Sequence, residues 1–248
     1  MLKPRILACL LALSGTLAAP AAIAQTAAPD YAAIVAAPDR SEADRKLDTN
    51  RAPAQWLAFI GAKPGMKILD IEAVYGWKAE LMARAVAPGG KVYAQNSEAA
   101  FARVKDRLEA RLKTPAAANI VSAVRPFEDP APTGMHDFDL VTFFYAYHDI
   151  TNLGVDRAKM HKAVYDALKP GGELVVGDYS AKPGAGTSVA QTLHRSDEAL
   201  VRSEIEAAGF KLIDHGDFLQ VPGDARDAHS HSGAEPVDIF VLKFRKPG

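Results

Sequence analysis

A histidine and a carboxylate stand at the end of an apolar run near the middle of the chain. The run "FDLVTFFYAYHDI", residues 138 to 150, is typical of a buried parallel strand and carries His148 and Asp149 near its end. Ligands of open α/β sheets bind beyond the carboxyl ends of such strands. His148 is the best candidate general base, because a partly desolvated imidazole titrates near neutrality. Neighbouring strand side chains point oppositely, so Asp149 could pair with it only from a loop. The alternative is a histidine that merely bonds a loop carbonyl.

His194 precedes the last predicted helix and follows the segment "SAKPGAGTS", residues 180 to 188. The two glycines of this segment suit a mobile loop that could cover a site and bring His194 across a cleft to His148. A solvated histidine at the start of a helix is the alternative.

His229 and His231 form an "HSH" pair, with Asp224 and Asp227 nearby. Histidines and carboxylates are ligands of transition metals, but a metal site needs at least three placed ligands. The sequence places no third ligand. A solvated loop is therefore expected, and no metal ligand is assigned.

The stretch "ILDIEAVYGWKAELMARAV", residues 68 to 86, reads as a buried strand, a short loop and an amphipathic helix. Many α/β proteins hold a nucleotide at such a junction, where glycines let the backbone turn sharply and approach the ligand. This loop keeps only Gly76. Glu72, Val74 and Tyr75 stand where small residues are expected.

Three junctions of one kind define the elements that would position these residues. In "AKPGMKILDI", "APGGKVYAQN" and "KPGGELVVGDY", which begin at residues 62, 87 and 169, a helical segment ends at Pro-Gly and an apolar strand follows. Repetition of helix, tight turn and strand predicts parallel βαβ units. Apolar residues at four-residue spacing support the helices: Trp77, Leu81 and Ala85, and Met160, Val164 and Leu168.

The last third of the chain ends differently. Before it, "NIVSAV" at 119 reads as one more buried strand. A helix is expected to start at Ser196 and to close at Gly209. "FKLIDHGDF" and "VDIFVLKFRK" then read as strands with no helix between them, which suits a hairpin.

Together these stretches resemble the class I S-adenosylmethionine (SAM) dependent methyltransferases. More narrowly, "RAPAQWLAFIGAKPGMKILDI", "GGKVYAQN", "FYAYHDI" and "ALKPGGELVVGDYSAKPGAGTSVAQTLHRSDEALVRSEIEAAGFKL" are similar to stretches of the exported predicted methyltransferases of bacteria. The resemblance spans residues 31 to 246. It implies an α/β, Rossmann-like, seven-stranded and mostly parallel sheet with helices on both faces and a C-terminal antiparallel β-hairpin. It also implies SAM as cofactor.

The resemblance carries over to particular residues. His148 and His194 become the candidate catalytic residues, and the candidate cofactor-binding residues are Asp70, Glu72, Gly76, Asn96 and Tyr147. Val74 is β-branched and opposes a left-handed backbone, and Tyr75 adds a ring, so weakened or altered SAM binding is expected.

Asn96 ends the strand "VYAQN", at the place where these enzymes have an acid that accepts both ribose hydroxyls. An asparagine offers one carbonyl acceptor, so it would hold one hydroxyl better than the other. Its alternative role is a turn residue that caps the helix starting near Ser97.

The amino terminus has the pattern of a secretory signal peptide. Lys3 and Arg5 precede an apolar run that ends in small residues, which predicts cleavage after Ala24 and a periplasmic or secreted protein. The predicted segments are a signal peptide (1–24), an arm (25–50) and a methyltransferase-like domain (51–248). Cys9, the only cysteine, would leave with the leader. The mature chain would have 27 basic and 30 acidic residues, a net charge of about −3, which predicts no nucleic-acid partner and no stable membrane insertion.

Two functions remain in competition. One is SAM-dependent methyl transfer to a small molecule, and the other is an exported binding protein that has kept the fold and lost the cofactor. A nicotinamide-linked oxidoreductase is disfavoured, because no G-x-G-x-x-G follows the first strand. No pattern in the sequence identifies the acceptor or the oligomeric state.

Overall fold

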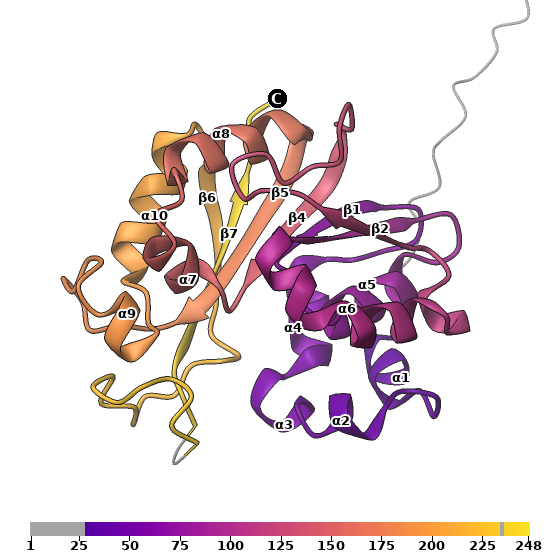
Figure 1. Cartoon of the computed structure of the whole chain (residues 1–248), viewed down its shortest axis with the longest axis horizontal. Coiled ribbons are helices and arrows are strands. Elements are labelled where there is room, and N and C mark those ends of the chain that lie inside the picture. The colour runs from indigo at the N-terminus through magenta and orange to yellow at the C-terminus, as the bar shows by residue number, and fades with distance from the viewer. Residues whose placement is uncertain (1–27, 234–235) are drawn as a thin grey trace, which may run out of the picture.

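One seven-stranded sheet organises the protein. The structure, a computed structural model, describes residues 28–233 and 236–248, so the predicted signal peptide at 1–24 lies outside the described residues. The sheet order is β3-β2-β1-β4-β5-β7-β6 (Figure 1). The strands are β1 (Lys67–Ile71), β2 (Lys91–Asn96), β3 (Ile120–Val124), β4 (Phe138–Phe144), β5 (Leu168–Tyr179), β6 (Lys211–Gly216) and β7 (Ile239–Arg245).

The five strands β1 to β5 pair in parallel, and β7 runs antiparallel to both β5 and β6. The prediction of a mostly parallel sheet with a terminal antiparallel hairpin is therefore confirmed.

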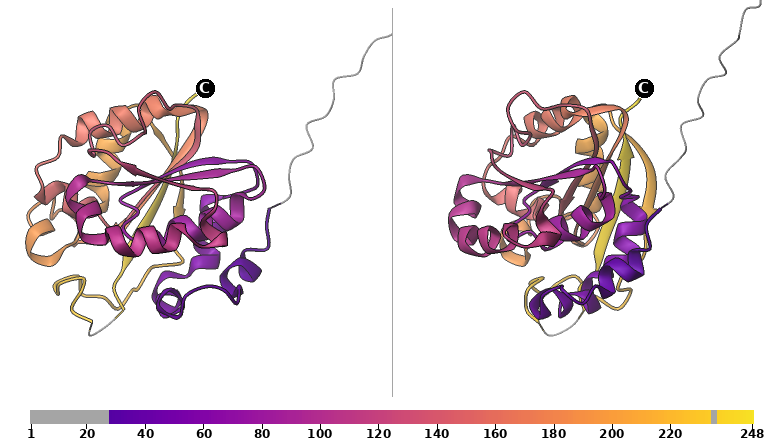
Figure 2. Two further views of the ribbon diagram at one scale, coloured as in Figure 1. Left: turned by 45° about the vertical axis from the view of Figure 1, so that its right-hand side comes forward. Right: turned by 90° about the vertical axis from the view of Figure 1, so that its right-hand side faces the viewer.

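Helices cover both faces of this sheet (Figure 2). Trp56 of α4 and Leu81 of α5 belong to the apolar core on one face, and Val164 of α8 and Ile205 of α10 to the core on the other. Within the described chain, no helix is both long enough and apolar enough to span a bilayer. The helices are α1 (Tyr31–Ala36), α2 (Glu42–Arg45), α3 (Asp48–Arg51), α4 (Pro53–Ile60), α5 (Trp77–Val86), α6 (Glu98–Leu112), η1 (Pro115–Ala117), α7 (Tyr147–Asn152), α8 (Arg157–Ala167), α9 (Ala190–Leu193) and α10 (Glu198–Ala207).

The N-terminal arm packs onto the domain through α1, which contacts α4 and α5. A single arginine of α6 ties the arm down. Arg111 donates to Asp44 of α2 (2.7 Å) and to the carbonyl of Tyr75 (2.9 Å), and it forms an ion pair with Glu80 of α5. The carboxylates of Asp44 and Glu80 are shielded from water. This arginine therefore links the arm, α5 and the loop after β1 to one another.

Two boundaries differ from the sequence expectation. The apolar run at 138–150 is not one strand, because β4 ends at Phe144 and α7 begins at Tyr147, so His148 lies on a helix. The cap of α10 is Asp197, whose carboxylate accepts from the amide of Ala199 (3.0 Å), and not Ser196. The Ser196 hydroxyl is used elsewhere, as described below.

The strand at 120–124 also differs from expectation. It lies at the edge of the sheet, and Val121 and Val124 are 40% and 43% exposed. The apolar residues at 120–124 therefore form a half-exposed edge strand, and the prediction of a buried strand is wrong.

Candidate functional site

The loop after β1 adopts left-handed backbone angles that favour glycine, although two of the three residues concerned are not glycine. Glu72 (φ 50°) and Val74 (φ 54°) are both left-handed, as is Gly76 (φ 83°). Side chains of β2 hold this path, because Gln95 accepts from the amide of Glu72 (3.0 Å) and Asn96 accepts from that of Val74 (2.7 Å). A non-glycine residue in this region costs on the order of 1–3 kcal/mol, which the surrounding hydrogen bonds must offset.

Asn96 uses both ends of its amide on this loop. Its oxygen accepts from Val74, and its nitrogen donates to the carbonyl of the same residue (3.1 Å). The cap of α6 is Ser97, whose hydroxyl accepts from the amide of Ala100. Asn96 therefore fixes the loop and does not cap α6. Its contact with a ribose hydroxyl stays a prediction.

Asp70 lies beneath the loop, fully buried. It accepts from the hydroxyl of Thr142 (2.8 Å) and lies 3.7 Å from Nζ of Lys78, which also donates to the carbonyl of Glu72 (3.3 Å). Burial raises the pKa of Asp70 and lowers that of Lys78, because both groups lose water around their charged forms. This pair supports the loop from below.

Glu72 faces a cavity of about 250 Å³ between the loop, α6 and the end of β4. Its side chain is 8% exposed, and among the described residues its Oε2 has no hydrogen-bond partner. Burial raises the pKa of Glu72, although the amide of Ser97 and the charge of Lys78 oppose this. The wall also includes Val74, Tyr75, Trp77, Arg103 and Asp149.

Tyr75 forms part of that wall and is partly buried. The guanidinium of Arg107 on α6 lies 3.8 Å from the centre of its ring. A cation over an aromatic face is an attractive contact, so Tyr75 is held against α6.

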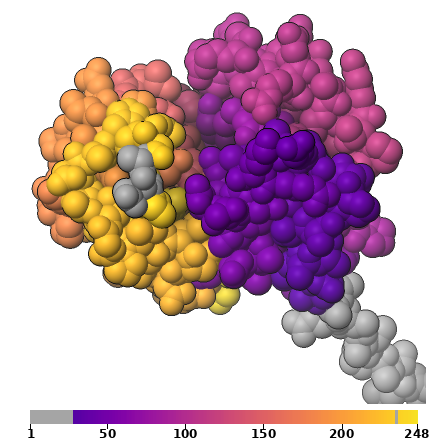
Figure 3. Space-filling model, turned by 90° about the horizontal axis from the view of Figure 1, so that it is seen from below, coloured from indigo at the N-terminus to yellow at the C-terminus, as the bar shows by residue number. Residues whose placement is uncertain are grey.

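A larger cavity of about 670 Å³ adjoins the first one and lies between the N-terminal arm and the loop that joins β6 to β7. These two parts of the chain, indigo and yellow, face each other in Figure 3. Four residues line both cavities: Arg51, Tyr145, Tyr179 and His231. The two spaces therefore meet at one boundary.

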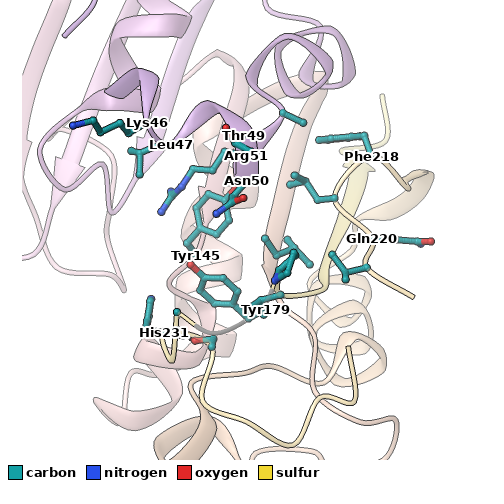
Figure 4. Close-up of a pocket in the computed structure, with 18 residues that line it drawn as sticks. Lys46, Leu47, Thr49, Asn50, Arg51, Tyr145, Tyr179, Phe218, Gln220 and His231 are labelled. Atoms are coloured by element: carbon teal, nitrogen blue, oxygen red, sulfur yellow. Dashed lines mark hydrogen bonds between the residues drawn. The ribbon is translucent and has the colours of Figure 1, made fainter. Parts of the chain in front are cut away.

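The shared residues form a stack (Figure 4). The Arg51 guanidinium lies 4.4 Å from the centre of the Tyr145 ring. It also lies 4.8 Å from the centre of the Trp77 ring. Ring centres are 5.6 Å apart from Tyr145 to Tyr179, and 5.3 Å from Tyr179 to His231. Arg51 of the arm, Tyr145, Tyr179 and His231 therefore lie in a row, and His231 at its end belongs to a group of histidines.

His148 is held by a carboxylate that the sequence analysis missed. Its Nδ1 lies 2.9 Å from Oδ1 of Asp178, near the end of β5, and its own amide donates to Oδ2 (2.8 Å). Ser196 also donates to Asp178 (2.6 Å). A carboxylate only accepts, so Nδ1 of His148 carries a proton directed at Asp178. The place of Asp178 at the end of "VVGDY" was a usable indication, since strand ends form the site.

Burial lowers the pKa of His148, but the charge and hydrogen bond of Asp178 outweigh burial, and the net pKa lies above the ordinary value. Asp149 contributes to the same shift, with its Oδ1 3.5 Å from Nε2 of His148. The two side chains can meet because both lie in the first turn of α7, where adjacent residues do not point in opposite directions.

His194 comes next to His148, with 5.1 Å between ring centres, as the sequence suggested. Its backbone is left-handed (φ 50°). Burial lowers the pKa of His194, and the nearby His148 and His229 lower it further. The structure also brings His229 (4.4 Å) and His231 (5.8 Å) to the His194 ring.

The two aspartates near the "HSH" pair are engaged elsewhere. Asp224 accepts from Arg195 (2.7 Å), and Asp227 lies 3.7 Å from Nζ of Lys182. The third group that the sequence could not place beside these histidines is thus His194.

Tyr147 lies away from both cavities. Its hydroxyl donates to Glu204 of α10 (2.5 Å) and lies 3.2 Å from Nε2 of His161 on α8. Its ring packs in the core on that face. The structure therefore does not bring this candidate cofactor residue to the crevice.

Comparison with known proteins agrees with this fold. No protein-family model matches the chain. The ubiquinone/menaquinone biosynthesis C-methyltransferase UbiE of Cupriavidus taiwanensis is 32% identical over 126 residues, 50% of this chain and 47% of that protein. The UbiE of Bordetella parapertussis is 34% identical over 136 residues, 52% of this chain and 48% of that protein. The match thus spans about half the length of these curated relatives.

Solved structures match over more of the chain. A SAM-dependent methyltransferase from Aquifex aeolicus superposes with a TM-score of 0.59 at 18% identity, over 82% of this chain and 96% of the other. A possible exported protein from Bordetella parapertussis superposes with a TM-score of 0.51 at 15% identity, over 83% and 66%. The chain has the fold of the class I SAM-dependent methyltransferase superfamily, as its motifs predict.

Proposed function

We propose that this protein is a SAM-dependent methyltransferase that acts on a small molecule. The observation that carries the proposal is the pair of adjoining cavities at the carboxyl edge of the parallel strands, where ligands of such sheets bind. A donor in the smaller cavity and an acceptor in the larger one would meet at Arg51, Tyr145, Tyr179 and His231. Half-length similarity to named C-methyltransferases supports the same reaction.

The charge and backbone of the smaller cavity fit SAM. The cofactor supplies a methyl group on a positively charged sulfur and also carries an amine. Glu72 offers a buried carboxylate oxygen with no partner in the described chain, which is complementary to a cation. The left-handed backbone at residues 72, 74 and 76 keeps the loop open to a ligand on its outer side. We therefore assign Glu72 and the loop around Gly76 to cofactor binding.

The smaller cavity is narrow for a ligand of the size of SAM. Small-molecule sites usually measure about 300–1,000 Å³, and the crevice measures about 250 Å³. SAM would have to extend past Arg51 into the larger cavity or displace the side chains of Val74 and Tyr75. Weakened binding, as expected from the sequence, agrees with this narrowness.

We assign proton transfer to His148. A methyl acceptor that attacks through O–H, N–H or an acidic C–H releases a proton, and Nε2 of the neutral His148 ring would have the lone pair to accept it. Asp178 would stabilise the charged ring. The remaining contribution of the protein would be proximity, with donor and acceptor held in line across the shared wall.

Titration of the purified protein with SAM in a calorimeter tests the proposal, and micromolar binding is expected. The double variant Val74→Gly, Tyr75→Gly should bind more tightly, because it widens the crevice and relieves the backbone at residue 74. Asp137→Gly is the matched control, since it removes a left-handed side chain (φ 63°) at the start of β4, the opposite edge of the sheet.

The competing function is an exported binding protein that has lost SAM. The side chains of Val74 and Tyr75 in the crevice favour it. If neither the native protein nor the widened double variant binds SAM while both remain folded, this second function replaces the first.

We infer that the protein acts outside the cytoplasm. The basis is the leader pattern of residues 1–24, with export to the periplasm or beyond. An enzyme there would need a supply of SAM, which is made inside the cell. The test of processing is given in the Discussion.

A further inference from the structure

Four imidazole rings gather beside the larger cavity from three separate parts of the chain. His148 belongs to α7, His194 follows α9, and His229 and His231 belong to the loop between β6 and β7. One nitrogen from each of His194, His229 and His231 lies within 4.8 Å of the others. These three histidines come from two segments that lie more than 30 residues apart in the sequence, so the fold and not local sequence brings them together.

We propose that His194, His229 and His231 form a binding site for a divalent transition-metal ion such as Zn²⁺. Imidazole suits Zn²⁺, Cu²⁺ and Ni²⁺, and sites with three protein ligands and one open position are the kind found in catalytic zinc centres. The site goes beyond methyl transfer and does not depend on SAM binding.

The spacing of the rings agrees with this geometry. Metal–nitrogen bonds of about 2.0–2.1 Å in a tetrahedral arrangement put the centres of bound imidazole rings roughly 5 Å apart. The observed separations are 4.4 Å from His194 to His229, 5.8 Å from His194 to His231 and 5.6 Å from His229 to His231. Small side-chain rotations would therefore bring the nitrogens onto one ion.

The two segments that carry these ligands are tied to each other by the backbone around them. The amide of Ser230, between His229 and His231, donates to the carbonyl of Leu193 (2.9 Å), the residue before His194. On the other side of His194, the buried guanidinium of Arg195 donates to the carbonyl of Ala228 (2.9 Å), the residue before His229. The ligand set is thus pre-positioned by four neighbours that are not ligands.

Two hydrogen bonds within the group involve ring nitrogens that could bind the metal ion, and one of them must break. Nδ1 of His229 accepts from the amide of His231 (3.1 Å), and Nδ1 of His231 lies 3.4 Å from the hydroxyl of Ser230. His231 can bind through Nε2 and keep its contact. His229 would exchange its weak backbone hydrogen bond for the metal.

The open position of the ion would face the site. His231 lines both cavities, and the carboxylate of Asp149 lies within 4.8 Å of a nitrogen of His194 and of His148. Asp149 would supply negative charge beside an ion held by neutral ligands. A ligand atom in the shared cavity, an oxygen, nitrogen or sulfur, could then complete the coordination.

The test uses the purified full chain after treatment with a chelator. Titration with Zn²⁺ in a calorimeter and with Co²⁺, followed by the visible absorption of the four-coordinate ion, should give one ion per chain. The variants His194→Gln, His229→Gln and His231→Gln should each weaken binding by about tenfold or more, since even residues behind the ligands contribute about 10–100-fold. Zn²⁺ should also raise the melting temperature of the native protein but not of these variants.

His215→Gln is the matched control, because this exposed histidine of β6 pairs with Glu198 outside the group. It should bind as tightly as the native protein. Failure of both ions to bind, or equal weakening by His215→Gln, would overturn the metal site. His229 and His231 lie on a surface loop, so their variants remain informative if His194→Gln fails to fold. SAM titration of the same samples keeps this result separate from the proposed function.

Discussion

Glu72 combines a left-handed backbone with a buried carboxylate that lacks a full set of partners. Glu72→Gly should remove the strain and the charge, whereas Glu72→Gln removes only the charge. We expect the free energy of unfolding of the glycine variant to exceed that of the glutamine variant by about 1 kcal/mol. Relief of the backbone strain contributes about 1–3 kcal/mol, and the greater flexibility of glycine in the unfolded chain reduces this by about 0.5–1 kcal/mol.

Urea denaturation of the two variants at pH 7 measures this difference. Equal stabilities would mean that the backbone at residue 72 is not strained. The same pair separates steric from electrostatic effects on SAM binding, since only glycine removes the side chain.

The chemistry of single residues could be predicted from the sequence only in part. His148 and His194 were found because they lie near strand ends, and the fold brings them together. Asp178 was missed, although it also ends a strand, because nothing in the sequence says which carboxylate will face a given ring. Asn96 was placed at the right strand end, but its partner, the backbone of Val74, depends on a loop path that no local pattern encodes.

At the scale of the elements, Arg111 joins α6 to the arm and to α5. Arg111→Met should leave the buried Asp44 without its cation, whereas Glu80 keeps Arg84 (2.8 Å). Loss of one partner of a buried pair costs about 3–5 kcal/mol. We expect faster hydrogen exchange in residues 40–52 than in the rest of the protein, because the arm loses its main polar tie.

Arg107→Met serves as the control for this experiment. Arg107 lies one turn away on the same helix, and its guanidinium packs over the ring of Tyr75. Exchange in the arm should stay as in the native protein. Equal protection in both variants would show that apolar contacts of α1 hold the arm without Arg111.

His161 links α8 to α7 and α10 and should make stability depend on pH. Burial lowers its pKa to about 4, and the charge of Arg157 adds to the effect. The unfolded chain binds the proton near pH 6.5 and the folded chain does not, so stability is full above pH 6.5 and falls as pH drops toward 4. At 1.36 kcal/mol per pKa unit, the loss approaches roughly 3 kcal/mol.

His161→Gln should flatten this dependence. Urea denaturation of the native protein and this variant between pH 7 and pH 4.5 measures it. Glu204 stays ionised in this range, because Arg157 and Tyr147 outweigh burial and hold its pKa below the usual value. An unchanged slope in His161→Gln would assign the pH dependence to other groups.

Element types were predictable where glycine and proline marked the ends. Two Pro-Gly junctions precede β1 and β2, as predicted, whereas the third lies inside β5, which already begins at Leu168. The boundary between β4 and α7 was missed because Tyr147 and Ile150 of the helix continue the apolar pattern of the strand and join the same core. The edge strand β3 was predicted as buried, since composition alone does not reveal whether a neighbour covers each face.

At the scale of the whole molecule, processing of the leader can be measured directly. We expect the intact mass of the protein from the periplasmic fraction to correspond to a chain that begins at Gln25. Ala24→Asp should block cleavage, because the protease requires a small residue there, and Ile23→Leu should not. A full-length mass in the native protein would contradict the predicted signal peptide.

The four neighbouring histidine rings allow assembly of the tertiary structure to be followed by spectroscopy. Their rings come from segments far apart in the sequence and shift one another's proton resonances only while those segments are together. A nuclear magnetic resonance spectrum of the histidine ring protons would therefore report, in one measurement and without any substrate, whether α7, α9 and the last long loop have assembled.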